Sequence, residues 1–397
     1  MKSDAFLNSI VINAIEKGCH ELLDIASYCG IYPNELKALL DGLIQQHRVA
    51  YSKNSGYSVV DDIESSQFRL PPPHPLDFDW RFDKNTTINL SEKILDECGN
   101  ENAILLLGTH SIQMELYRRQ VANKVILYDS NSGLIEDLDT NASSSNFICI
   151  RKDLFNTKDL VQDYDLGEIG VVFMDPPWYL DFYLFFLTFA ARTVKPGGAV
   201  FVSLLPIGTR KTACREREKI FAHAKICGLH LEQLHKNGIT YVTPEFEKKS
   251  LSTMGIKNVG NWRKGDMVVF RKIRCCKNYP DLKVIDKEIQ DNNWLSFAIK
   301  GFPVKIRKDE NDKRAPRIVK IEKNNILPTV SRRYKGRDKI DLWLWDNRVF
   351  GIEGKTHFIT ALYSLSQTEI PIAYNTMDEK MADTAMLLLK DILKDIL

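Results

Sequence analysis

Short runs of residues without a single polar side chain are the feature that most restricts how this chain can fold. The runs "AILLL" (103–107) and "VVFM" (171–174) lie in a region, 101 to about 275, where such runs alternate with segments of helical character. A strand with one face in water would alternate polar and apolar residues, so these runs are typical of a sheet covered by helices on both faces. The region is therefore predicted to form a doubly wound, Rossmann-like α/β fold.

The strands and helices expected in this region follow from hydrophobic periodicity and from the glycines and prolines between them. The expected strands are 103–108, 124–129, 147–154, 171–175, 198–206, 229–234 and 266–273. The expected helices are 111–120, 132–142, 180–193 and 215–228. Their alternation is what a parallel sheet with helical crossovers requires.

Residues 1–62 are predicted to form a separate winged-helix domain. Three short helical patterns, the first two ending at Gly18 and Gly30, precede a hairpin whose apolar flanks surround residues 54–56. Winged helices serve in DNA binding and in protein docking. The third helical pattern has Lys37 as its only basic residue before Arg48, and acids flank it. Docking or dimerisation is therefore slightly favoured over DNA binding.

A proline- and aromatic-rich linker, 63–84, is expected between this domain and the cofactor-binding domain, 85–275. Its Phe78, Trp80 and Phe82 alternate with charged residues. That alternation predicts an extended strand packed on the next domain.

Residues 276–397 are expected to form a small, basic α+β region. The segment 340–355 suggests a hairpin that is followed by a helix, and the chain ends in an amphipathic helix. Within 301–340 there are 13 Lys and Arg residues against five Asp and Glu. Nucleic acid is one partner that this local charge would suit, and a solvated basic face is the simpler alternative.

The overall composition excludes several classes of protein. The 397 residues carry 54 Lys and Arg against 52 Asp and Glu, a net charge of +2, so charge alone does not indicate nucleic-acid binding. No apolar run reaches the ~18 residues of a membrane span, and the first residues lack the features of a signal peptide. The eight cysteines include no C-x-x-C pair. We therefore expect a cytoplasmic protein with reduced thiols, no metal site and no membrane partner.

Four neighbouring predicted strands end at residues suited to a ligand site. Gly108 follows the first strand, Asp129 the second, Asp153 the third and Asp175 the fourth. In a doubly wound sheet the carboxyl ends of the strands form the ligand crevice, and an acid about 20 residues after the glycine turn binds a ribose diol. Any one of these acids alone would more simply cap a helix, but four strand ends in register predict a pocket. No G-x-G-x-x-G follows the first strand, so a dinucleotide is disfavoured.

The fourth strand runs into Asp175-Pro176-Pro177-Trp178 and then Tyr179. Proline ends the strand and restricts the residue before it, which makes this a rigid loop. A conjugated amine is a poor nucleophile. A carboxylate and a fixed Pro176 carbonyl can accept hydrogen bonds from its two N–H groups and return lone-pair density to the nitrogen. The four residues of the loop are thus predicted to be catalytic, with Trp178 and Tyr179 stacking on the acceptor or on a flipped base. A stiff loop with Trp178 in the core is the structural alternative.

A second stretch, 237–255, precedes the last predicted strand and is a candidate lid over the acceptor. Its candidate acceptor-binding residues are Tyr241, Phe246 and Glu247, and an ordinary surface loop is the alternative. Thr86 and Thr87 precede the first helix of the α/β region and are candidate caps of that helix.

On these residues, the segment 85–275 resembles the class I S-adenosylmethionine-dependent methyltransferase superfamily. In that family the turn after the first strand supports the methionine part of the cofactor, the acid after the second binds the ribose, and the residues after the third flank the adenine. The resemblance assigns these roles to Gly108-Thr109-His110, Asp129-Ser130 and Asp153-Leu154, and it places Thr86-Thr87 at the cofactor. The family usually carries two or three glycines after the first strand, whereas this chain has one.

The loop itself carries the more specific part of the resemblance. Asp175-Pro176-Pro177-Trp178 is similar to the D/N-P-P-aromatic motif of family members that methylate exocyclic amines, and "VKPGGAVFVS" (194–203) is similar to the family's turn before strand five.

The layout of the whole chain also resembles the branched-chain polyamine synthases, which transfer an aminopropyl group from decarboxylated S-adenosylmethionine. The segments "KNTTINLSEKI" (84–94) and "NWRKGDMVVFRKI" (261–273) carry this resemblance. That family has a run of acids after the first-strand glycine, whereas this chain has Thr109-His110-Ser111. Basic residues that would repel a polyamine follow the fifth strand: Arg210, Lys211, Arg215, Arg217 and Lys219.

The sequence therefore predicts an S-adenosylmethionine-dependent transferase that methylates an amine nitrogen, with an exocyclic amine of a nucleobase as one candidate acceptor. Aminopropyl transfer from decarboxylated S-adenosylmethionine to a polyamine is the first alternative. The second is a non-catalytic regulator that binds nucleic acid through the N-terminal domain and residues 301–340.

Overall fold

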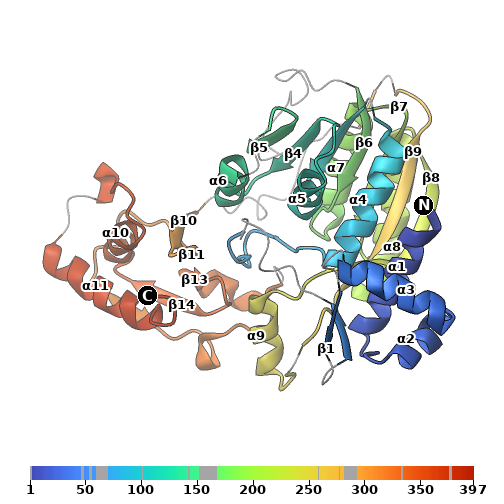
Figure 1. Cartoon of the computed structure of the whole chain (residues 1–397). Helices are drawn as coiled ribbons and strands as arrows, with labels where there is room; N and C mark the ends of the chain where they lie inside the picture. Colours follow the sequence, from blue (N-terminus) through green and yellow to red (C-terminus); the bar gives the residue numbers. More distant parts are fainter. Residues whose placement is uncertain are drawn as a thin grey trace. The chain divides into compact units, whose positions relative to one another are not determined.

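The chain divides into two compact units, Met1–Arg69 and Leu70–Leu397. The structure is a computed structural model (Figure 1). It describes residues 2–45, 49–52, 56–59, 70–100, 102–141, 144–151, 168–257, 259–276, 278–280, 293–331, 334–374 and 378–397.

The N-terminal unit consists of three helices and a two-stranded hairpin. The helices are α1 (Lys2–Glu16), α2 (Leu22–Cys29) and α3 (Pro33–Gln45), and the antiparallel strands are β1 (Val49–Ser52) and β2 (Gly56–Val59). One apolar cluster, which includes Val11, Ile25 and Leu40, joins the helices to β1. The predicted helices and hairpin flanks are thus present, residues 54 and 55 of the hairpin turn lie outside the described residues, and the winged-helix function stays a prediction.

A seven-stranded sheet forms the centre of the second unit, in the order β5-β4-β3-β6-β7-β9-β8. Its strands are β3 (Ala103–Leu107), β4 (Val125–Asp129), β5 (Phe147–Arg151), β6 (Ile169–Met174), β7 (Val194–Leu204), β8 (Leu229–Thr240) and β9 (Lys264–Lys272). The first five are parallel, and β9 runs antiparallel between β7 and β8. The strand order reverses at β3, so the crevice beside its carboxyl end is the expected ligand site.

Helices cover both faces of this sheet, which explains the fully apolar strands (Figure 1). These helices are α4 (Lys84–Cys98), α5 (His110–Arg118), α6 (Ser132–Asn141), α7 (Leu180–Thr193) and α8 (Ala213–Ile226), and a further helix, α9 (Glu245–Thr253), follows β8. Leu105 of β3 packs in the cluster that contains residues of α7 and α8, whereas Ile104 and Leu106 pack with α4, α5 and α6. The predicted doubly wound fold is confirmed.

Two expectations for this unit were inaccurate. The strand β8 continues to Thr240, six residues beyond the predicted end, because it is an edge strand whose exposed residues carry no apolar signal. The described part of the linker, from residue 70 on, does not form an extended strand: Phe78 has a left-handed backbone (φ 55°), and in this part the recorded bridge is that of Phe82 to Tyr241. The alternation of aromatic and charged residues instead reflects aromatic side chains that pack on the next elements from an irregular segment.

The C-terminal part contains an antiparallel sheet in the order β10-β11-β13-β14-β12. Its elements are β10 (Trp294–Ile299), β11 (Phe302–Arg307), β12 (Arg317–Val319), β13 (Leu342–Leu344), β14 (Val349–Glu353), α10 (Lys355–Leu365) and α11 (Glu379–Ile392). The predicted hairpin and the two predicted helices are therefore present.

Buried hydrogen bonds attach this C-terminal part to helix α9. Asn347 Nδ2 donates to Ser250 Oγ (2.8 Å) and to the Leu327 carbonyl (2.9 Å), and Ser250 Oγ donates to the same carbonyl (3.2 Å). Lys249 of α9 also forms an ion pair with Asp346. These contacts fix the segment that follows Leu327 near α9.

Candidate functional site

A cavity of about 110 Å³ lies at the carboxyl ends of β3 and β4. It is lined by Asp77, Phe78, Asp79, Gly108, His110, Tyr128, Asp129, Ser130, Asn131, Leu134, Asp175, Pro177, Phe182 and Phe186. Gly108 has a left-handed backbone (φ 66°), which lets the chain turn sharply between β3 and α5. The structure thus brings together the predicted residues Gly108, His110, Asp129, Ser130 and Asp175.

Besides Asp175, three carboxylates from two segments line this small cavity. Asp79 lies 3.2 Å from His110 Nε2 and also pairs with Arg81, and although burial opposes its ionisation, these partners hold the pKa of Asp79 well below its usual range. Burial raises the pKa of Asp129 to about 6, against the opposing charge of His110. Asp77 forms an ion pair with Lys305 of β11. The acids that the first-strand turn lacks are therefore supplied by the linker.

Three of the predicted cofactor residues lie elsewhere. Thr86 and Thr87 are inside the first turn of α4, whose cap is Asp83, and Thr86 Oγ1 accepts a hydrogen bond from the Thr240 backbone. The prediction that they cap the helix was wrong, because Asp83 is the cap, and neither threonine lines the small cavity. Thr109 is buried at the start of α5 behind Gly108. Asp153 and Leu154 lie outside the described residues.

The loop after β6 separates the small cavity from a larger one. Asp175 and Pro177 line both cavities, whereas Pro176 and Trp178 line only the larger. The Pro177 carbonyl accepts the Tyr179 N–H at 2.6 Å, and over the described residues no hydrogen bond is recorded to the Pro176 carbonyl. The Pro176 carbonyl is thus the one of the two that has no hydrogen-bond partner among the described residues, and its role toward an acceptor stays a prediction.

Asp175 is held by a short chain of hydroxyl groups. Tyr241 Oη donates to Asp175 Oδ1 at 2.7 Å, and Ser203 Oγ lies 2.5 Å from Tyr241 Oη. Burial raises the pKa of Asp175 to about 7, and the hydrogen bonds and the charge of Arg263 limit the rise. A carboxylate with a pKa near neutrality can both accept N–H hydrogen bonds and take up a proton. Tyr241, predicted to bind the acceptor, therefore also positions Asp175.

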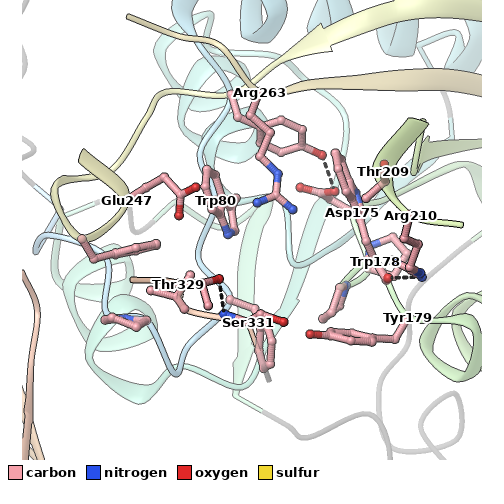
Figure 2. Close-up of a pocket in the computed structure, with 17 residues that line it drawn as sticks. Trp80, Asp175, Trp178, Tyr179, Thr209, Arg210, Glu247, Arg263, Thr329 and Ser331 are labelled. Atoms are coloured by element: carbon pink, nitrogen blue, oxygen red, sulfur yellow. Dashed lines mark hydrogen bonds between the residues drawn. The ribbon is translucent and has the colours of Figure 1, made fainter. Parts of the chain in front are cut away.

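The larger cavity has a volume of about 310 Å³, and its walls include several aromatic side chains (Figure 2). It is lined by Pro75, Phe78, Trp80, Asp175, Pro176, Pro177, Trp178, Tyr179, Thr209, Arg210, Tyr241, Phe246, Glu247, Arg263, Thr329, Val330 and Ser331. All the predicted acceptor-binding residues, Tyr179, Tyr241, Phe246 and Glu247, are among them. The volume is at the lower end of the roughly 300–1,000 Å³ of small-molecule sites.

Sequence reasoning missed Arg263 and Trp80. The Arg263 guanidinium carbon lies 3.9 Å from the ring centre of Trp80 and 4.2 Å from that of Trp178, so two indoles enclose it. Figure 2 shows the guanidinium directed into the cavity, between Glu247 and Asp175. Arg263 lies within the "NWRK" segment (261–264), and Trp80 and Trp178 lie in segments far from it in the sequence, so nothing local indicates that the three side chains meet.

Two of the basic residues after β7 are already paired. Arg210 forms an ion pair with Glu216 and donates to the Trp178 carbonyl at 2.6 Å. Arg217 is buried and pairs with Asp266 at 2.5 Å. Lys211, Arg215 and Lys219 are exposed and do not line either cavity. Of these five basic residues, Arg210 is the one that lines the larger cavity.

Among the described residues, the structure also bears on metal binding, membrane spanning and disulfide bonds. No group of three or more His, Cys, Asp or Glu side chains there is arranged to hold a metal ion. No helix in the described segments has both the length and the apolar character needed to cross a membrane. All eight cysteines are free thiols.

The chain matches no protein-family model and no curated protein sequence. Among solved structures it is similar to the branched-chain polyamine synthase of Thermus thermophilus, with 13% identity over 72% of this chain and 92% of that chain and a TM-score of 0.44. It is also similar to a putative RNA methyltransferase of Pyrococcus horikoshii, with 15% identity over 53% of this chain and 95% of that chain and a TM-score of 0.38. A third similar structure is a magnesium protoporphyrin IX methyltransferase of Synechocystis, solved with bound S-adenosylmethionine. It has 10% identity over 47% of this chain and 78% of that chain and a TM-score of 0.32. Similarity at this level does not transfer an activity, so the function has to be argued from the site.

Proposed function

We propose that this chain is an S-adenosylmethionine-dependent transferase that alkylates an amine nitrogen. The observation that carries the proposal is the place of Asp175, which lines both a small cavity at the strand ends and a larger aromatic one. A group bound in the small cavity could therefore be transferred past Asp175 to an acceptor in the larger cavity.

The residues of the small cavity fit an adenosyl sulfonium compound. Asp129 and Ser130 follow β4, where a ribose diol would be bound, and Asp129 Oδ1 already orders the turn by accepting the Asn131 N–H at 2.9 Å. Phe182 and Phe186 give the cavity an apolar side, and the nearby carboxylates suit a positive sulfonium. When bound, this compound supplies an electrophilic carbon whose bond to sulfur breaks as a neutral thioether leaves.

The residues of the loop bind and orient the nucleophile. Tyr241 occupies Asp175 Oδ1, which leaves Oδ2 and the Pro176 carbonyl to accept the two N–H groups of an amine. The nitrogen lone pair forms the new N–C bond, the electron pair of the broken C–S bond stays on sulfur, and Asp175 takes the proton that the nitrogen loses. Trp178 and Tyr179 border the acceptor and exclude water.

Methyl transfer from S-adenosylmethionine is the first candidate reaction, because the loop composition suits a flat, poorly nucleophilic amine. The test is calorimetric titration of the full chain with S-adenosylmethionine and with its decarboxylated form, followed by mass analysis of an amine panel. We expect Asp175→Ala to abolish transfer and to leave cofactor affinity within a few-fold. Failure of both compounds to bind would refute the proposal. A collapse of cofactor affinity in Asp175→Ala would instead assign Asp175 to the cofactor.

Aminopropyl transfer is the second candidate, and the small cavity favours it specifically. The described lining of that cavity includes Asp77, Asp79 and Asp129 but no Lys or Arg. This set suits the terminal ammonium of an aminopropyl group better than a methionine carboxylate. At least tenfold tighter binding of the decarboxylated compound would select this reaction over methyl transfer.

A further inference from the structure

The acceptor cavity contains one arginine whose charge is not matched by a direct partner. In the parts of the chain that the structure describes, the Arg263 guanidinium makes no hydrogen bond or ion pair, although it contributes charge to Asp175 and Glu247. The other arginine of the cavity, Arg210, is paired with Glu216. Arg263 is thus the cation of this cavity that remains available to a ligand.

Two tryptophans fix the orientation of that cation. The Arg263 guanidinium carbon lies 3.9 Å from the ring centre of Trp80 and 4.2 Å from that of Trp178, so the two indoles restrict its position and leave its N–H groups for polar contacts. A rigid, forked set of donors is what binds a carboxylate or phosphate through two parallel hydrogen bonds. Figure 2 shows this group directed into the cavity, which also contains Asp175.

The two carboxylates of the cavity do not replace an external anion. Burial raises the pKa of both Asp175 and Glu247, which reduces the negative charge that they place beside Arg263. Neither lies within ion-pair distance of Arg263 in the described structure. The cavity therefore offers acceptors for an amine at Asp175 and donors for an anion at Arg263.

We infer that the acceptor is an amine that also carries a carboxylate or phosphate group, which Arg263 binds. This inference rests on the proposed function and defines its acceptor class. A simple polyamine would place a second ammonium near Arg263 and would be rejected by like charge. Arg263 therefore determines specificity, whereas Asp175 acts on the reacting nitrogen.

The test compares matched pairs of probes that differ in one anionic group. Comparing the affinity of ornithine with that of 1,4-diaminobutane shows the effect of a carboxylate. Comparing adenosine 5′-monophosphate with adenosine shows the effect of a phosphate. Binding to the full chain is followed through tryptophan fluorescence, to which Trp80 and Trp178 contribute, and by calorimetry. The wild type should bind the anionic member of at least one pair at least tenfold more tightly, and the pair that shows the preference identifies the source of the anion.

The variants then assign the preference to Arg263. Arg263→Gln should abolish it, and Arg263→Lys should retain part of it. Arg215→Gln, which removes an exposed charge of α8 outside both cavities, should leave it unchanged. Equal binding of both members of each pair by the wild type, or a preference that survives in a folded Arg263→Gln protein, would refute the inference. Cofactor titration of the same proteins is the separate readout: if no cofactor binds, the proposed function fails, whatever the anion preference.

Discussion

At the scale of single residues, the chemistry depends on the ionisation of Asp175. Its carboxylate is useful to an amine only when it is charged, and burial keeps its pKa at about 7. The groups that face it are the Tyr241 and Ser203 hydroxyls, Arg263 and, farther away, His110. Each of them favours the ionised carboxylate, so removing one of them should make Asp175 a weaker acid.

Replacing Tyr241 with Phe tests this arrangement. The variant loses the hydrogen bond to Asp175 Oδ1, so the pKa of Asp175 should rise further, and the acidic limb of the kcat/KM profile should move about one pH unit upward. In the wild type, activity should fall as the pH drops through about 7. Tyr183→Phe is the matched control, because Tyr183 is an equally buried phenol that bonds the Leu205 N–H and the Ser203 carbonyl instead. An acidic limb that moves equally in both variants would contradict the assigned role of Tyr241.

At the scale of elements, the acceptor cavity depends on contacts between α9 and the C-terminal part. The segment 329–331 forms one wall of the cavity, and the bonds among Asn347, Ser250 and the Leu327 carbonyl fix the chain just before it. The small cavity has no lining residue beyond Phe186 among those described. Damage to these contacts should therefore affect the acceptor and spare the cofactor.

Substitutions of Asn347 separate the two roles of that residue. Asn347 has a left-handed backbone (φ 70°) and makes three side-chain hydrogen bonds. Asn347→Gly loses only the bonds, whereas Asn347→Ala also strains the backbone, so Ala should destabilise the protein by about 1 kcal/mol more than Gly. Both should lower the free energy of unfolding by about 2 kcal/mol or more and raise the acceptor KM. Denaturant unfolding and steady-state kinetics measure these effects, and weakened cofactor binding in the Gly variant would contradict the separation.

The sequence predicted the elements whose signals are local. Apolar runs identified the central strands, and the loop from Asp175 to Trp178 was placed correctly at the end of β6 because proline and a buried strand leave few alternatives. Trp80, Ser203 and Arg263 were not predicted, because each lies on a different segment and only tertiary packing brings them to Asp175. The place of Asp77 and Asp79 at the small cavity was not predicted for the same reason, since the linker meets the first-strand turn only through tertiary packing.

At the scale of the whole molecule, part of the local positive charge of 301–340 makes contacts within the fold. Lys305 pairs with Asp77 and Arg314 with Asp312, while Arg307 and Arg337 stack on Trp294 and Trp343. Residues 332 and 333 lie outside the described residues. Nucleic-acid binding by this region therefore stays a prediction. Fewer of its basic side chains are without a contact in the fold than the sequence suggested.

The division of the chain into two units leads to the last prediction, which is that residues 70–397 suffice for cofactor binding. The apolar cluster of the first unit contains only residues up to Tyr57, and the clusters of the second begin at Leu70, so neither core depends on the other. Calorimetry on the truncated chain should give a cofactor affinity within about twofold of that of the full chain. A tenfold loss of affinity would correspond to a change of about 1.4 kcal/mol in the free energy of binding. The matched control is a chain that begins at residue 84 and so also lacks Asp79, Trp80 and Phe82, which line or support the cavities. That chain should lose binding of the cofactor and of the acceptor, and equal loss in both truncations would show that the first unit contributes to the site.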